Sequence, residues 1–149
     1  MSTPFFSEIS VDSSKLDCTT SGGDVGKGDD LEERLVRFAV GVIDMTEGFP
    51  QTFTGQHLGN QLLRCATSTA ANYAEARACE SLRDFIHKLG IVGKEMNESR
   101  VWLKMVSIRK LAADEVVNRA FQECDELCRI IAVSRRTAEQ NARAKGLRK

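Results

Sequence analysis

Two stretches of this chain, residues 58–76 and 85–106, repeat mainly apolar side chains at alternating spacings of four and three. That spacing returns to one side of an α-helix, and the apolar side needs a partner to cover it. Neither stretch contains proline, so nothing interrupts the hydrogen-bond ladder. We therefore predict two long helices that pack against each other. The two stripes are Leu58, Leu62, Cys65, Thr69, Asn72 and Ala76, and Phe85, Leu89, Val92, Met96, Ser99, Leu103 and Val106.

Two further segments carry the same repeat, one on each side of this pair. The first is predicted to begin at Asp30, whose side chain can cap a helix with Glu33 as its capping-box partner. Gly48 and Pro50 end it, because proline cannot continue the ladder. The last segment begins near Asp114. Their stripes are Leu31, Leu35, Phe38, Val42 and Met45, and Val117, Phe121, Cys124, Cys128 and Ile131.

The central helices are predicted over residues 54–79 and 81–108, with Ser81 as the N-cap of the second and Asp84 at the reciprocal position. All four segments are joined by short connections. The predicted fold class is therefore all-α, an antiparallel up-down-up-down four-helix bundle. Gly90 and Gly93 lie inside the third helix, where each costs ~1 kcal/mol relative to alanine. We expect them to allow close contact with the alanine-rich second helix.

The ends of the chain differ in composition from the middle. Residues 1–29 are rich in Ser, Thr, Asp and Gly, and are predicted to form a disordered acidic extension. The bundle is expected over residues 30–140, followed by a basic tail at 141–149. Basic side chains in and just before this tail can contact phosphates, although a solvated, fraying helix end is an equally good interpretation. The basic side chains in question are Arg135, Arg136, Arg143 and Lys145.

The five cysteines form no CxxC pair and are odd in number, which favours a reducing, cytoplasmic setting. No apolar run approaches the roughly 18 residues of a membrane span. The N-terminus does not have the basic start and apolar stretch of a secretion signal. These features predict a cytoplasmic protein that makes no contact with a membrane.

A polar stripe runs beside the apolar one on each central helix. If the two polar faces meet, Arg64 and Asn72 can bond Glu75, Glu95 or Glu98. We favour a structural ion-pair network over a ligand site, because the set contains no nucleophile and no histidine base. A polar residue such as Asn72 within an apolar stripe can also specify the number of partners. The residues of this predicted network are Gln61, Arg64, Ser68, Asn72, Glu75, Glu95 and Glu98.

Metal and nucleophile chemistry find little support. A di-metal carboxylate bundle needs two Glu-x-x-His motifs, and this chain offers only the imperfect Asp84-x-x-His87. Cys124 and Cys128 have no histidine or second cysteine pair nearby for zinc. The glycine-rich SGGDVGKG lacks the Ser or Thr that follows the lysine of a phosphate loop. We therefore predict no enzyme activity, no cofactor and no metal.

The segments FPQTFTGQHLGNQLLRCATSTAANYAEA and SLRDFIHKLGIVGKEMNESRVWLKM resemble the small bacterial family encoded within intervening sequences of 23S ribosomal RNA genes. The resemblance extends from Leu31 to about Val106. It implies a four-helix bundle that forms ring-like homopentamers and has no established enzymatic activity. A related accessory protein of diversity-generating retroelements works with a reverse transcriptase and binds nucleic acid. The polar-network residues match positions that recur as family signatures.

These observations together predict a non-enzymatic, homo-oligomeric scaffold, expected to be a pentamer, that contacts RNA or a nucleic-acid-handling partner. Two alternatives stay open. One is a purely structural homo-oligomer without a nucleic-acid role, and the other, at lower weight, is a metal-dependent enzyme.

Overall fold

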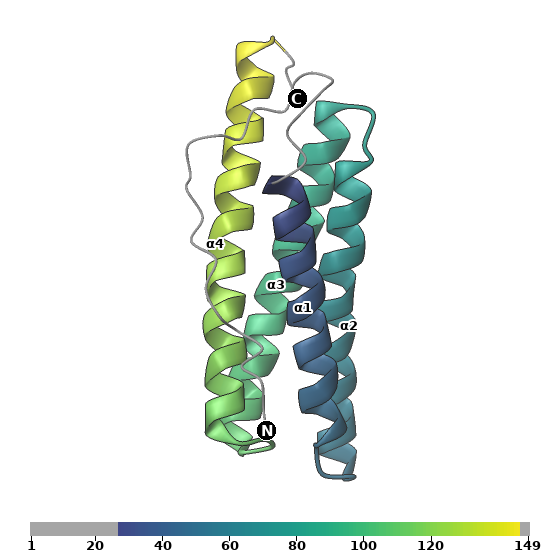
Figure 1. The fold of residues 1–149 in the computed structure, drawn as a ribbon, viewed down its shortest axis with the longest axis vertical. Coiled ribbons are helices and arrows are strands. Elements are labelled where there is room, and N and C mark those ends of the chain that lie inside the picture. Colours follow the sequence, from purple (N-terminus) through teal and green to yellow (C-terminus); the bar gives the residue numbers. More distant parts are fainter. Residues whose placement is uncertain (1–26, 147–149) are drawn as a thin grey trace.

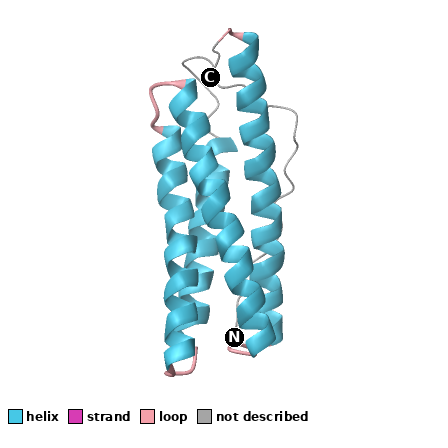
Figure 2. Ribbon diagram, turned by 180° about the vertical axis from the view of Figure 1, so that it is seen from behind, coloured by secondary structure: helices cyan, strands magenta, loops and turns pink. Residues whose placement is uncertain are grey.

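A computed structural model describes residues 27–146, which form four long antiparallel helices (Figure 1). The helices are α1 (Lys27–Glu47), α2 (Phe53–Arg77), α3 (Leu82–Arg109) and α4 (Asp114–Ala144). Helices and short loops account for all of this part of the chain, and it contains no strand (Figure 2). The predicted all-α fold class is confirmed. None of these helices has the length and hydropathy needed to cross a bilayer.

The four helices pack as a ring of neighbours in which α3 contacts both α2 and α4. Helix α1 contacts α2 closely and α4 less extensively, and it lies diagonally opposite α3. Leu35, Leu62, Leu89 and Leu127, one from each helix, are fully buried in a single core cluster. The predicted stripes therefore face one another, and Phe121 is half-buried against the same core.

The predicted apolar stripe of α2 is wrong at one position, Asn72. Tyr73 is buried, with 6% of its surface exposed, whereas Asn72 is half-buried at the edge of α2. At about 100° per residue, Tyr73 lies ~20° from the direction of Leu62 and Asn72 lies ~80° away. The aromatic ring therefore occupies the core position, and the amide faces the seam between α2 and α3.

Side chains cap the N-termini of two of the three helices whose preceding residue the structure describes. The hydroxyls of Thr52 and Ser81 accept hydrogen bonds from backbone N–H groups three residues later, each at 3.1 Å. The predicted cap at Ser81 is confirmed. Helix α1 instead begins at Lys27, so Asp30 lies in its first turn. There its negative charge interacts favourably with the positive end of the helix dipole. Helix α4 has no side-chain cap.

The outer helices extend past the residues at which the predicted bundle begins and ends. Helix α1 includes residues 27–29 of the predicted extension, and α4 includes residues 141–144 of the predicted tail. The remainder of the predicted extension and residues 147–149 lie outside the described residues.

The two glycines of α3 contact α4, so the expected contact with α2 is wrong. A Cβ atom at Gly90 would lie 3.7 Å from the guanidinium carbon of Arg135, and one at Gly93 would lie 3.7 Å from a methyl group of Ile131. The side of α3 that faces α2 instead carries long polar side chains such as Lys88 and Glu95. Positions 90 and 93 therefore face α4, at distances where a Cβ atom would make ordinary van der Waals contact.

Candidate functional site

The seam between α2 and α3 contains an ion-pair cluster centred on Arg64. One guanidinium nitrogen of Arg64 lies 2.8 Å from a carboxylate oxygen of Glu98, and another lies 3.5 Å from Glu95. Glu95 is mostly buried, with 16% of its side chain exposed, whereas Glu98 is about half exposed. The polar faces of the two helices do meet at this point, and one arginine balances two acids.

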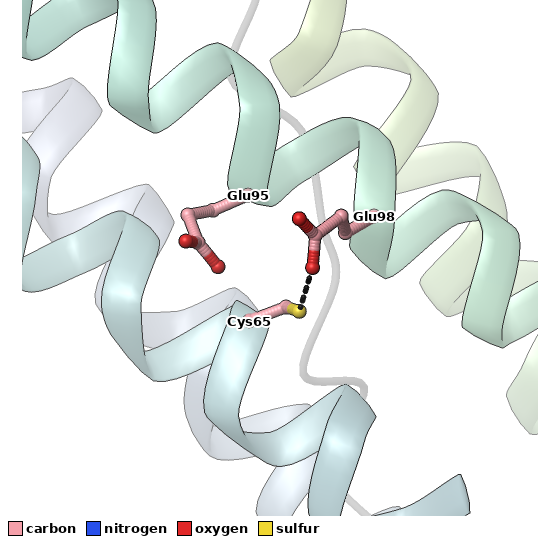
Figure 3. Close-up of side chains that lie close together, drawn as sticks. All are labelled: Cys65, Glu95 and Glu98. Carbon is pink, nitrogen blue, oxygen red and sulfur yellow. Dashed lines mark hydrogen bonds between the residues drawn. The ribbon is translucent and has the colours of Figure 1, made fainter.

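A buried thiol lies directly beneath this cluster. The Sγ atom of Cys65 is fully buried and donates a hydrogen bond to the Glu98 carboxylate at 3.2 Å (Figure 3). Burial, reinforced by the hydrogen bond to Glu98, raises the pKa of Cys65 to about 12. The same hydrogen bond, together with the one that Arg64 donates, lowers the pKa of Glu98. The thiol is therefore protonated and the carboxylate ionised at neutral pH.

Cys65, Glu95 and Glu98 are the residues of this seam that could hold a metal ion. Their ligand atoms all lie within 4.8 Å of one another, and a thiolate with two carboxylates is a donor set that zinc accepts. However, zinc needs the deprotonated thiol, and the Arg64 guanidinium already bonds both carboxylates. Glu95 and Glu98 belong to the predicted polar network, whereas Cys65 was predicted only as a member of the apolar stripe, although it is adjacent to Arg64 in the sequence.

The other members of the predicted polar network do not join this cluster. The side-chain amide of Asn72 donates to the backbone oxygen of Ser68 at 2.9 Å and to its hydroxyl at 3.0 Å, so its expected bond to an acid is wrong. Lys88 of α3 pairs with Glu75 of α2. Gln61 is half-buried on the same seam. Whether Asn72 influences assembly stays a prediction.

The raised pKa of Cys65 leads to a testable expectation about its reactivity. At pH 8 the native thiol should be alkylated by iodoacetamide about a thousandfold more slowly than the same cysteine in urea, because only the thiolate reacts. Peptide mass spectrometry over a time course measures both rates on the same residue. Equal rates in the two states would show that Cys65 is accessible and ionises normally.

A second polar surface is a groove between the first half of α3 and the last turns of α4. The groove has a volume of about 890 Å³. Its wall on α3 carries Arg83, Ile86, His87, Gly90, Ile91 and Lys94, and its wall on α4 carries Arg135, Glu139, Ala142 and Arg143. We call this surface the basic groove.

The charged side chains that line the basic groove are mostly positive. Among the residues that the structure describes, Glu139 is the only acid in its lining, and it is already paired with Arg135 at 3.0 Å. Within residues 27–146, Arg83, Lys94 and Arg143 have no acid within salt-bridge distance. The Arg135 guanidinium lies beside the α3 backbone at Gly90, 3.7 Å from where a Cβ atom would be. The groove is therefore a concave surface suited to an anion.

Sequence reasoning identified half of this surface. Of the four basic side chains proposed to contact nucleic acid, Arg135 and Arg143 line the groove, whereas Arg136 and Lys145 are exposed outside its lining. The wall on α3 was missed. A signal was present, because positions 83, 87, 90 and 94 have the spacings of four, three and four that place them on one helix face.

The chain is similar to known proteins over most of the bundle. The family model described as 23S rRNA-intervening sequence protein matches residues 31–133. That match extends beyond α3 into α4, past the range over which the sequence alone showed a resemblance. No curated protein matches the chain.

A solved structure of the S23 ribosomal protein family, from Bacteroides thetaiotaomicron, is also similar. That protein has unknown function and is 25% identical to this chain. The alignment covers 73% of this chain and 97% of the other, with a TM-score of 0.68. The family match over more than half of the sequence and the shared architecture agree. The chain belongs to the family of 23S rRNA-intervening sequence proteins.

Proposed function

We propose that the chain is a non-enzymatic helical-bundle scaffold that assembles with copies of itself and contacts RNA through the basic groove. The observation that carries the proposal is the convergence of four basic side chains from two helices on one concave surface. Arg83, Lys94, Arg135 and Arg143 supply these charges, and their single acidic neighbour is already paired. Arginine and lysine side chains bind phosphates through charge-assisted hydrogen bonds, and they neutralise the phosphate backbone of nucleic acids.

RNA is favoured over a small anion by the shape of the charged surface. Arg83 and Lys94 are eleven residues apart on α3, which corresponds to roughly 16 Å along the helix. A surface of this length can contact several consecutive phosphates, whereas one small anion would occupy only a part of it.

Fluorescence anisotropy with a labelled single-stranded RNA tests this proposal. Affinity should fall as salt rises, with a log–log slope of roughly −2 to −3 if three or four phosphates are contacted. The triple variant R83Q/K94Q/R143Q should bind about 10- to 30-fold more weakly, and its salt slope should decrease in magnitude by about 2, because three contacts are removed.

A matched variant separates this local effect from net charge. K104Q/R109Q/R119Q removes the same charge from exposed positions outside the groove and should bind RNA with nearly unchanged affinity. Thermal melting checks that both variants fold. Equal weakening by the two triple variants, or an affinity of the native chain that does not respond to salt, would contradict the proposal.

The assembly part of the proposal rests on an apolar stripe on the outer face of α3. Val101, Met105 and Ile108 are spaced by four and three, and they are 52%, 40% and 71% exposed. Exposed apolar side chains that line up on one helix face are typical of a surface that another chain covers. The same stripe favours the second candidate function, a purely structural homo-oligomer.

Light scattering tests assembly independently of RNA. We expect a particle of five chains of 16.5 kDa each. Met105→Glu should reduce its mass, because a charge would be buried at the contact, whereas Val133→Glu on α4, at a position 50% exposed, should leave it unchanged. A native particle with the mass of one chain would contradict self-assembly, and oligomers without RNA affinity would support the structural alternative.

A further inference from the structure

The basic groove lies at the same end of the bundle as the start of the described chain. Asp29 and Glu32, in the first turns of α1, pair with Arg77 at the end of α2. The short connection after Arg77 leads directly into α3, whose first half forms one wall of the groove. Figure 1 shows the beginning of α1 and the C-terminal end of α4 directed toward the same end of the molecule.

Ion pairs between α1 and α4 also show how far along the bundle axis α1 begins. Arg34 bonds Glu123 at 2.7 Å and Glu126 at 2.9 Å, which aligns the two helices at that level. Lys27 lies seven residues before Arg34, about 10 Å toward the common end, and Arg135 lies nine residues after Glu126, about 14 Å in the same direction. Lys27, the first residue of α1, therefore lies at nearly the height of Arg135, where the groove begins.

The composition of that segment complements the groove. Residues 1–26 carry four acidic side chains and one basic side chain, Lys15. The acids are Glu8, Asp12, Asp17 and Asp24. The same segment contains apolar residues, including Ile9 and Val11 between two of the acids. The groove presents four cations with one paired acid, together with the apolar side chains of Ile86 and Ile91.

We propose that residues 1–26 dock in the basic groove of their own chain and compete there with RNA. Twenty-six residues can span up to about 86 Å when extended, which is enough to cross the end of the bundle. Tethering supplies an effective concentration on the order of millimolar, so even weak charge pairing populates the docked state. The competition rests on the RNA contact proposed above, whereas the docking itself does not.

Zero-length carbodiimide crosslinking tests the docking without RNA. The reagent joins a lysine to a carboxylate only where the two touch, and Lys94 is the lysine of the groove. We expect mass spectrometry to find Lys94 joined to one of the four acids of residues 1–26 in the native full-length chain. The Lys88–Glu75 ion pair is an internal positive control for the reagent. A Lys88–Glu75 crosslink without any crosslink from Lys94 to this segment would overturn the docking.

A mixture of isotopically light and heavy chains identifies which copy supplies the segment. We expect the Lys94 crosslink to join two light or two heavy peptides, as an intramolecular contact requires. Crosslinks between a light and a heavy peptide in the statistical proportion would overturn the intramolecular assignment and place the segment in the groove of a neighbouring copy.

RNA affinity tests the competition in the full-length chain. E8Q/D12N/D17N/D24N should bind RNA about five- to tenfold more tightly than the native protein, as expected if the groove is free in only 10–20% of native molecules. The matched variant D44N/E47Q/E80Q/E115Q removes the same charge from exposed positions of the described chain and should leave affinity unchanged.

The crosslinking and the RNA-binding measurements distinguish failure of the docking proposal from failure of the RNA function. A Lys94 crosslink with no RNA binding by either variant would overturn the RNA function and leave the docking in place. RNA binding with equal affinity in the native chain and in the first variant would overturn the competition alone. Equal tightening by both variants would show a general charge effect and would also overturn the competition.

Discussion

Replacing Leu89 by alanine is expected to lower the free energy of unfolding by about 2–5 kcal/mol. Leu89 is fully buried in α3, the helix that contacts both α2 and α4. Removing three carbons from this position loses their transfer free energy and leaves a cavity that three helices would have to collapse to fill. Urea unfolding followed by circular dichroism, at two protein concentrations so that assembly is accounted for, measures the change.

Two substitutions serve as controls for Leu89→Ala. Val133→Ala alters a side chain that is 50% exposed on α4 and should cost less than about 0.5 kcal/mol. Leu89→Met keeps the volume and should cost less than about 1.5 kcal/mol. A loss below about half a kcal/mol for Leu89→Ala would show that the apolar stripe of α3 does not form the core.

Replacing Arg34 by methionine is expected to destabilise the fold by about 2–3 kcal/mol, less than a fully buried pair would lose. The guanidinium lies against Glu123 in a two-point contact of 2.7 and 3.0 Å, and each side chain is only 14% exposed. Burial lowers the pKa of Arg34, but hydrogen bonds to Glu123 and Glu126 outweigh this effect and raise it. Without Arg34, the Glu123 carboxylate would remain mostly buried and have no counter-charge.

A second substitution and an exposed pair make this expectation specific. R34M/E123L removes both charges and should recover most of the loss, because the cost arises from the unpaired acid. Arg37→Ala breaks an i, i+4 pair with Glu33 whose side chains are 54% and 60% exposed, and it should cost no more than about 0.5 kcal/mol. If Arg34→Met costs no more than Arg37→Ala, the α1–α4 contact does not depend on this ion pair.

The sequence predicted the core well because helical periodicity is a local property. Leu62, Leu89 and Leu103 are fully buried at the positions where their spacing places them. The error at Asn72 has the same local origin, because the spacing of the stripe allows either position 72 or position 73 to face the core. The larger aromatic side chain of Tyr73 occupies it.

The two candidate sites were harder to predict because each combines distant segments. The thiol–carboxylate cluster joins Cys65 to Glu98, which is 33 residues away. The basic groove joins Arg83 to Arg143 across α3 and α4. In the sequence, the basic residues of α3 appear scattered among acids. Only the packing of α4 beside α3 shows which of these basic residues share a surface with few acids.

The sequence by itself determined that this chain forms four amphipathic helices, because the period of its apolar residues and its capping signals act within single segments. Only the tertiary structure decided which polar faces meet. Arg64 therefore lies between Glu95 and Glu98, and Gly90 lies beneath the Arg135 guanidinium. The physical reason is that the rotation of one helix against another depends on the side-chain volumes of both, and no single segment contains that information.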